Sequence, residues 1–184
     1  MTPQPRKPRV LIVDDHPANR LAFRMLLEPL YTVAVAANGR DALELALNHE
    51  FAVILLDVRM PGMGGFEVAE QLRKDERTRY TPIVFMSAYD RTDFHAKRGY
   101  IAGATDYIFS PVDEDLLKYK VGTYVQIFLR NEALWLQVQG LQETVRTLQH
   151  ELAQCRPTEQ VRVEIRRLEG QIEALKDQLD PVPS

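Results

Sequence analysis

Short apolar runs that end in aspartate constrain the fold of this chain more than any other feature. Val10–Val13 runs into Asp14 and Asp15, and Phe51–Leu56 runs into Asp57. Apolar runs of this length, separated by helix-like segments, are typical of buried parallel strands. The carboxyl ends of parallel strands meet at one edge of the sheet, where open α/β folds bind ligands, so we expect three carboxylates there. The bland alternative is that these aspartates only cap the helices that follow.

Three carboxylates at one edge repel one another by roughly 4 kcal/mol per pair at an effective dielectric constant near 20. A hard divalent cation with oxygen ligands removes that repulsion, and Mg²⁺ is the usual ion. The sequence therefore predicts a magnesium site. The four histidines have no metal-ligand spacing and are expected at the surface; they are His16, His49, His95 and His150.

Strand and helix signals alternate over the first two thirds of the chain. A glycine-rich loop at Met60–Gly65 precedes one helix, and a polar helix is predicted at about Asp93–Ala102. This order of elements predicts the α/β class, with a five-stranded, parallel, doubly wound sheet of the flavodoxin type. The predicted strands are Arg9–Asp14, Thr32–Ala36, Ala52–Leu56, Pro82–Ser87 and Asp106–Ser110.

After Pro111 the pattern changes to one long helix, from Asp113 to about Cys155, with a 3.5-residue apolar repeat. Such a repeat predicts a coiled coil, and β-branched residues at a with leucine at d favour a parallel dimer. The alternative is an amphipathic helix packed on its own domain. The a positions are Asn131, Val138, Val145 and Leu152, and the d positions are Ile127, Leu134, Leu141 and Leu148.

Few charges flank this repeat, because its e and g positions are largely glutamine and threonine, which makes a homodimer the simplest expectation. Cys155 falls at position d, where it is either a small apolar filler or an interchain disulfide partner.

A second apolar stripe follows Pro157, which interrupts the helix. It is one residue out of step with the first stripe. The segment therefore either restarts the coil, which we favour, or folds back as a hairpin. The stripe consists of Val161, Ile165, Leu168, Ile172, Leu175 and Leu179.

The expected organisation has five parts. Residues 1–8 form a disordered N-terminus, residues 9–126 the α/β domain, and residues 127–156 a coiled coil continuous with its last helix. Residues 157–180 form the second helical segment, and residues 181–184 a disordered tail.

Composition excludes several classes of protein. The 184 residues have a formal net charge of -3, which gives no footprint for nucleic acid. The single cysteine excludes a disulfide framework within one chain and fits a reducing compartment. We expect a cytoplasmic protein without contact to a membrane, because no stretch approaches about 20 apolar residues and the basic start lacks an apolar core.

Five motifs in order make the segment from Arg9 to Gln126 resemble the receiver domain of bacterial two-component response regulators. They are Val13-Asp14-Asp15, Leu55-Leu56-Asp57, Met60-Pro61-Gly62, Met86-Ser87-Ala88, and Gly103-Ala104-Thr105-Asp106-Tyr107-Ile108 before Pro111.

The resemblance implies a role for each matching residue. Asp57 is then the phosphoacceptor, which takes a phosphoryl group from a histidine kinase. Asp15 and Asp57 are implied as direct Mg²⁺ ligands, Asp14 as a ligand through water, and Arg59 as a ligand through its backbone carbonyl. Ser87 is implied to hydrogen-bond the phosphoryl group, and Tyr107 to turn inward when Ser87 moves.

One position departs from the family pattern. Where the family usually has lysine, directly before the proline after the fifth strand, this chain has Ser110. Two interpretations follow: phosphorylation persists with altered coupling, which we favour, or the domain is degenerate and serves as a phosphorylation-independent dimeric scaffold. Arg59 and Tyr89 lie two residues beyond Asp57 and Ser87, and their bulk predicts a long-lived phosphoryl state.

No motif of a separate enzymatic or DNA-binding output follows the receiver-like segment. The expected output is the helix itself, which transmits the signal through a dimeric coiled coil by a change in its crossing or register. A third reading is that the chain is a fragment of a larger regulator.

Overall fold

The computed structural model describes residues 7–87, 103–154 and 159–179. The predicted helix at Asp93–Ala102, Tyr89, His95, Cys155 and the predicted tail at 181–184 lie outside the described residues. No helix in the described part of the chain is long and apolar enough to cross a membrane.

The sheet has five parallel strands in the order β2-β1-β3-β4-β5. This confirms the predicted fold class, and the observed strand ends lie within one residue of the predicted ones. The strands are β1 (Arg9–Val13), β2 (Thr32–Ala36), β3 (Val53–Asp57), β4 (Ile83–Ser87) and β5 (Asp106–Phe109). The helices are α1 (Pro17–Leu27), α2 (Gly39–Asn48), α3 (Gly65–Lys74), α5 (Glu114–Gln154) and α6 (Glu159–Asp177).

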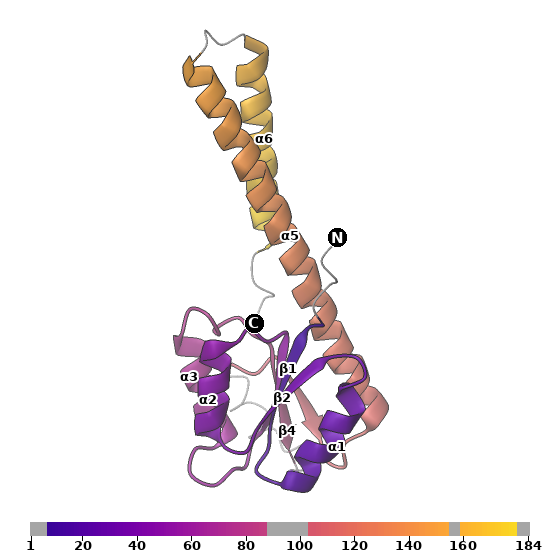
Figure 1. The fold of residues 1–184 in the computed structure, drawn as a ribbon. Coiled ribbons are helices and arrows are strands. Elements are labelled where there is room, and N and C mark those ends of the chain that lie inside the picture. Colours follow the sequence, from indigo (N-terminus) through magenta and orange to yellow (C-terminus); the bar gives the residue numbers. More distant parts are fainter. Residues whose placement is uncertain (1–6, 88–102, 155–158, 180–184) are drawn as a thin grey trace. The chain divides into compact units, whose positions relative to one another are not determined.

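Helices cover both faces of the sheet: α2 and α3 lie on one face, and α1 with the first turns of α5 on the other (Figure 1). The central strands are therefore apolar at every position rather than at alternate ones. Leu11 and Ile54 pack with α2 and α3 in the largest hydrophobic cluster, while Val10 and Val53, which point to the opposite face, are fully buried as well.

The order of the strands places a switch point between β1 and β3. The chain leaves β1 for β2 on one side and returns to β3 on the other. Helices that depart to opposite faces leave a crevice beyond the carboxyl ends of these two strands. Asp14 and Asp15 follow β1 at this crevice, and Asp57 ends β3.

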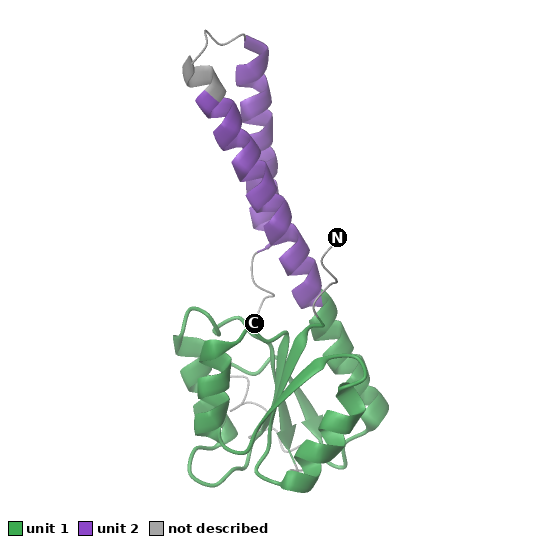
Figure 2. Ribbon diagram, in the orientation of Figure 1, with its two compact units in different colours: residues 1–126, 184 green, residues 127–183 purple. Residues whose placement is uncertain are grey.

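The chain divides into two compact units, with the division between Gln126 and Ile127 inside α5 (Figure 2). The first unit holds the sheet. In it, Leu117, Val121 and Val125 are the buried residues of α5.

The second unit is a helical hairpin in which α6 packs back against α5. Our preference for a restarted coil after Pro157 was wrong, and the structure has the fold-back alternative. Antiparallel packing does not require the two apolar stripes to share one register, so their one-residue offset is no obstacle. The buried residues are Val138, Val145, Ile165, Leu168 and Ile172, with Leu141, Leu148, Val161, Leu175 and Leu179 packed against them. Thus α6 of the same chain lies on the stripe that we had assigned to a second copy.

Candidate functional site

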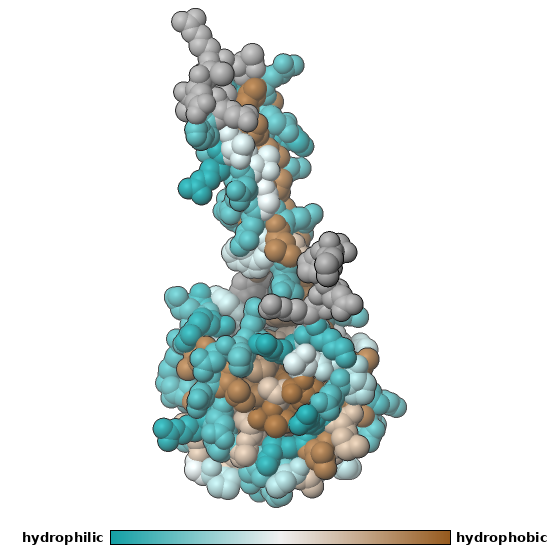
Figure 3. Space-filling view, in the orientation of Figure 1, coloured by the Kyte–Doolittle hydropathy of each residue, from teal (hydrophilic) through white to brown (hydrophobic). Residues whose placement is uncertain are grey.

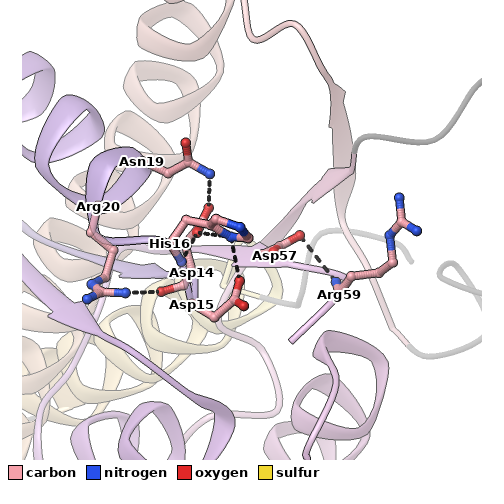
Figure 4. Close-up of polar contacts among 7 residues, drawn as sticks. All are labelled: Asp14, Asp15, His16, Asn19, Arg20, Asp57 and Arg59. Atoms are coloured by element: carbon pink, nitrogen blue, oxygen red, sulfur yellow. Dashed lines mark hydrogen bonds and ion pairs between the residues drawn. The ribbon is translucent and has the colours of Figure 1, made fainter. Parts of the chain in front are cut away.

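Asp14 and Asp15 are positioned by the turn that links β1 to α1. Pro17 occupies the first turn of α1, so the helix begins directly after His16. Asp14 is 3% exposed, and its Oδ1 accepts a hydrogen bond from the backbone N–H of His16 at 2.8 Å. The Nδ1 of His16 lies 2.8 Å from Oδ1 of Asp15. Figure 4 shows these side chains together with Asp57 at the ends of β1 and β3.

The first turn of α1 supplies two more contacts to Asp14. Asn19 donates from Nδ2 to Oδ2 of Asp14 at 3.0 Å, and Arg20 donates from Nη1 to the carbonyl oxygen of Asp14 at 2.7 Å (Figure 4). Both carboxylate oxygens of Asp14 therefore already accept a hydrogen bond from the protein. That engagement fits a ligand that reaches a metal through water better than one that binds it directly.

Asp57 is held at the end of β3 by close packing of the chain that follows. A Cβ atom on Gly65 would lie 2.2 Å from the carbonyl oxygen of Asp57, so only glycine fits at the start of α3. The backbone N–H of Arg59 donates to Oδ1 of Asp57 at 3.2 Å. The guanidinium group of Arg59 points away from the carboxylates in Figure 4.

The environment of Asp57 raises its pKa to about 6, chiefly because the carboxyl group is partly buried. The carboxylates of Asp14 and Asp15 raise this pKa further, while the hydrogen bond from Arg59 and the charge of His16 lower it. The three acidic side chains thus lie close enough to repel one another, as the sequence predicted. A cation among them would remove this repulsion.

One hollow at this edge of the sheet brings together most of the residues that the sequence selected. Asp14, Asp57, Arg59, Ser87 and Ser110 all line it. Ser87 is buried at the end of β4, and its carbonyl oxygen accepts a hydrogen bond from the backbone N–H of Ser110 at 2.8 Å.

An adjoining hollow is lined by Asp15 and Arg59 together with the loop from Met60 to Gly64. Arg59 therefore contributes to both hollows. Tyr107 lines neither of them: its ring is 8% exposed in the core, 5.4 Å from the ring of Phe85 and 6.0 Å from that of Phe109.

The missing lysine has no lysine substitute among the described residues that line the two hollows. The basic side chains there are Arg59 and His16. The side chain of Ser110 is exposed and is too short to carry a charge toward Asp57. The departure seen in the sequence therefore remains a departure in the structure.

The residues at the carboxyl end of β1 fit a divalent cation. Ligand atoms of Asp14, Asp15 and His16 lie within 4.8 Å of one another. The available donors near Asp57 are carboxylate and carbonyl oxygens, which suit Mg²⁺. The electrostatic repulsion at Asp57 is the observation that favours a bound cation over a set of helix caps.

Sequence reasoning missed the neighbours of the carboxylates. His16 is exposed, as expected, but it also pairs with Asp15, and Asn19 and Arg20 hold Asp14. The signal was Pro17: a helix that begins there places positions 19 and 20 in its first turn, beside the end of β1.

Comparison with known proteins agrees with this geometry. The sequence model of the response regulator receiver domain matches residues 10–122. The chain belongs to this family. Its receiver domain is 40% identical over 114 residues to the response regulator PleD of Caulobacter vibrioides, a match that covers 61% of this chain and 25% of PleD. It is 37% identical over 110 residues to the protein PilH of Pseudomonas aeruginosa, covering 59% of this chain and 90% of PilH.

Solved structures share the receiver fold. The chemotaxis protein CheY4 of Vibrio cholerae superposes with a TM-score of 0.61 at 31% identity, covering 64% of this chain and 98% of CheY4. The receiver domain of a sensor histidine kinase from Pseudomonas aeruginosa, with a magnesium ion coordinated in its active-site cleft, gives a TM-score of 0.60 at 26% identity, covering 65% of this chain and 98% of that domain. The chain spans about a quarter of the length of PleD and of a probable cyclic di-GMP phosphodiesterase from Vibrio cholerae.

Proposed function

We propose that this receiver domain accepts a phosphoryl group on Asp57 from a histidine kinase. The observation that carries the proposal is the position of Asp57, beside two further carboxylates and in one hollow with Ser87. Receiver domains of the GacS sensor kinases of Pseudomonas are among the relatives, which supports a histidine kinase as the partner.

The chemistry assigned to Asp57 is nucleophilic. A carboxylate oxygen forms a bond to phosphorus while the bond between phosphorus and the donor nitrogen breaks, and that nitrogen keeps the electron pair. Bound Mg²⁺ supplies positive charge beside the phosphoryl oxygens. Asp15 and Asp57 would hold the ion directly, Asp14 through water, and Arg59 through its carbonyl oxygen.

The remaining site residues have separate tasks. The hydroxyl of Ser87 donates to a phosphoryl oxygen at the mouth of the hollow. Tyr107 adjusts its ring as Ser87 shifts, and this couples the hollow to β5. Arg59 limits the approach of a hydrolytic water, so we expect the phosphoryl group on Asp57 to persist.

The output of the proposed switch is carried by α5, which is a single helix from Glu114 to Gln154. We propose that two copies associate as a parallel homodimer and that phosphorylation of Asp57 changes how they pack. The hairpin alters one part of this scheme: α6 already covers the buried stripe of α5, so the second copy must use another surface.

A second function is favoured by Ser110. With no lysine at this position, the receiver would assemble partners as a dimeric scaffold whether or not Asp57 carries phosphate. The two functions predict different responses to the same reagent.

The test is incubation of the full chain with Mg²⁺ and a small phosphodonor, followed by intact mass measurement. The proposed function predicts the added mass of one phosphoryl group in the wild type and none in Asp57→Asn or without Mg²⁺. Absence of the added mass in the wild type, together with unchanged self-association, would instead establish the scaffold.

A further inference from the structure

The two helices of the hairpin differ in charge. Over residues 133–150, α5 carries two charged side chains, Glu143 and Arg146, whereas α6 carries nine over its 19 residues. Protein surfaces that become buried in an interface are depleted of charge, while surfaces that stay in water are not. The charge-poor helix, α5, is therefore the one suited to lie inside a larger assembly.

Only one side of the apolar stripe of α5 is covered by α6. The a residues Val138 and Val145 are 0% and 8% exposed. The d residues Leu134, Leu141 and Leu148 are only half-buried. At about 100° per residue, the surface next to d and away from a is formed by positions g and c. This open side continues the hydrophobic stripe. In Figure 3, apolar side chains also form a run along the visible face of the hairpin, flanked by hydrophilic ones.

The g and c positions are small and uncharged between residues 133 and 147. Gly140 has open space around it, because a Cβ there would meet nothing within 4 Å. The hydroxyls of Thr144 and Thr147 donate to the carbonyl oxygens of Gly140 and Glu143 of their own helix, so these threonines present methyl groups outward. We define the α5 strip as the half-buried leucines and these neighbours: Ala133, Leu134, Gln137, Gly140, Leu141, Thr144, Thr147 and Leu148.

We propose that the α5 strip is the surface on which a second copy of this chain binds, through the same strip. The inference rests on the homodimer of the proposed function and places its interface. Two hairpins joined in this way form a four-helix bundle with α6 on the outside, where its charged side chains stay in water. A second copy is the fitting occupant because the strip carries no charge, so pairing it with itself brings no like charges together, and because its small residues permit close approach of two helices.

The size of the strip predicts the strength of the association. Sixteen residues span about 24 Å of helix. Such a contact falls near or below the ~1,200 Å² at which stable interfaces begin, so the expected dissociation constant is in the micromolar range. A dimer of this strength can respond to phosphorylation.

The test is sedimentation velocity of the full chain from about 1 to 200 µM, the range around the expected constant. Gly140→Leu places a bulky side chain in the strip, in space that is open within one chain, so the hairpin is retained. We expect it to weaken dimerisation at least about tenfold. Gly170→Leu is the matched control on α6, where a Cβ likewise meets nothing within 4 Å, and it should dimerise as the wild type does.

Two further variants guard against misfolding and a different face. If circular dichroism shows that Gly140→Leu loses helix, Thr144→Arg tests the same strip by placing like charges opposite each other. Trp135→Gln changes an apolar side chain that is 54% exposed on the other side of α5, and it should leave dimerisation unchanged.

The outcomes separate this inference from the proposed function. A wild-type dimer that persists in both Gly140→Leu and Thr144→Arg, or that Trp135→Gln disrupts instead, overturns the α5 strip but leaves a homodimer. A wild-type monomer at every concentration overturns the strip and the homodimer together. Neither result changes the phosphorylation of Asp57, which mass measurement reports independently.

Discussion

The carboxyl group of Asp57 carries the strongest electrostatic conflict described at the site. Its pKa of about 6 results first from partial burial and then from the charges of Asp14 and Asp15. An unfolded chain lacks both effects, and its aspartates titrate near 3.8. The folded state therefore binds more protons than the unfolded state between these two values, and it loses stability as the pH rises through about 6.

This linkage predicts the effect of Asp57→Asn on stability in metal-free buffer. At pH 7.5 the variant should raise the free energy of unfolding by about 1–2 kcal/mol, a value reduced for the partial solvent exposure of the group. Below about pH 4 the gain should vanish, because Asp57 is then protonated in both states of the wild type. Urea unfolding at the two pH values, with a chelator present, measures the difference. A gain of equal size at both would contradict the electrostatic cause.

Ser110 leads to a second prediction at the same scale. Ser110→Lys adds a positive charge to the hollow that holds Asp57, so it should lower the pKa of that carboxyl group below about 6. It should also raise the rate of phosphorylation from a small donor. Ser110→Met, which adds a side chain of similar length without a charge, is the control. Carbon-detected NMR titration reads the pKa, and equal effects of the two variants would mean that charge is not the cause.

At the scale of single elements, α3 is tied to the start of β5 by one buried guanidinium group. Arg73 donates to the carbonyl oxygen of Gly103 at 2.6 and 3.0 Å, and to those of Thr78 and Thr81 at 3.3 and 3.0 Å. Burial lowers the pKa of Arg73 to about 10. Gly103 has a φ of +91° and has no room for a Cβ beside Arg73. The segment before β5 is thus fixed by a donor that faces only carbonyl groups.

Loss of this donor should be costly. Arg73→Met keeps most of the side-chain volume but leaves buried carbonyl oxygens unsatisfied, so we expect a loss of about 2–4 kcal/mol in the stability of the first unit. Thermal unfolding followed by near-ultraviolet circular dichroism measures it. Arg79→Met, at an exposed position whose guanidinium lies over the ring of Tyr80, is the control and should change stability by less than about 0.5 kcal/mol.

At the scale of the whole molecule, the chain consists of two units with separate cores that share one helix. The first unit holds the proposed magnesium ligands, and the second is held by apolar packing between α5 and α6, including Val138 and Ile165. A ligand of the first unit should therefore stabilise that unit selectively.

Mg²⁺ tests this division. At ten times its dissociation constant the ion should stabilise the first unit by about 1.4 kcal/mol and leave the unfolding of the hairpin unchanged. Hydrogen exchange resolved by peptide separates the two units. Asp15→Asn should abolish the protection that Mg²⁺ gives. Equal protection of α6 by Mg²⁺ would contradict independent units.

The sequence by itself determined the sheet and the acidic edge. A parallel strand buried on both faces must be apolar throughout, and the residue at its end must lie at the edge of the sheet, so Val10–Val13 and Val53–Leu56 located Asp14, Asp15 and Asp57 without any coordinates. The period of the second stripe likewise predicted a helix after Pro157.

The tertiary structure alone decided what each apolar stripe packs against. A period of 3.5 residues is the same whether a helix meets a second copy or its own chain, and the turn around Pro157 allowed either, so the pairing of Val138 with the α6 stripe was not readable from spacing. The contacts of Asn19, Arg20 and Arg73 were also beyond the pattern, because each joins groups whose proximity depends on how helices pack on the sheet. Local periodicity determines which face of an element is apolar, and only the packing of the whole chain determines which partner covers it.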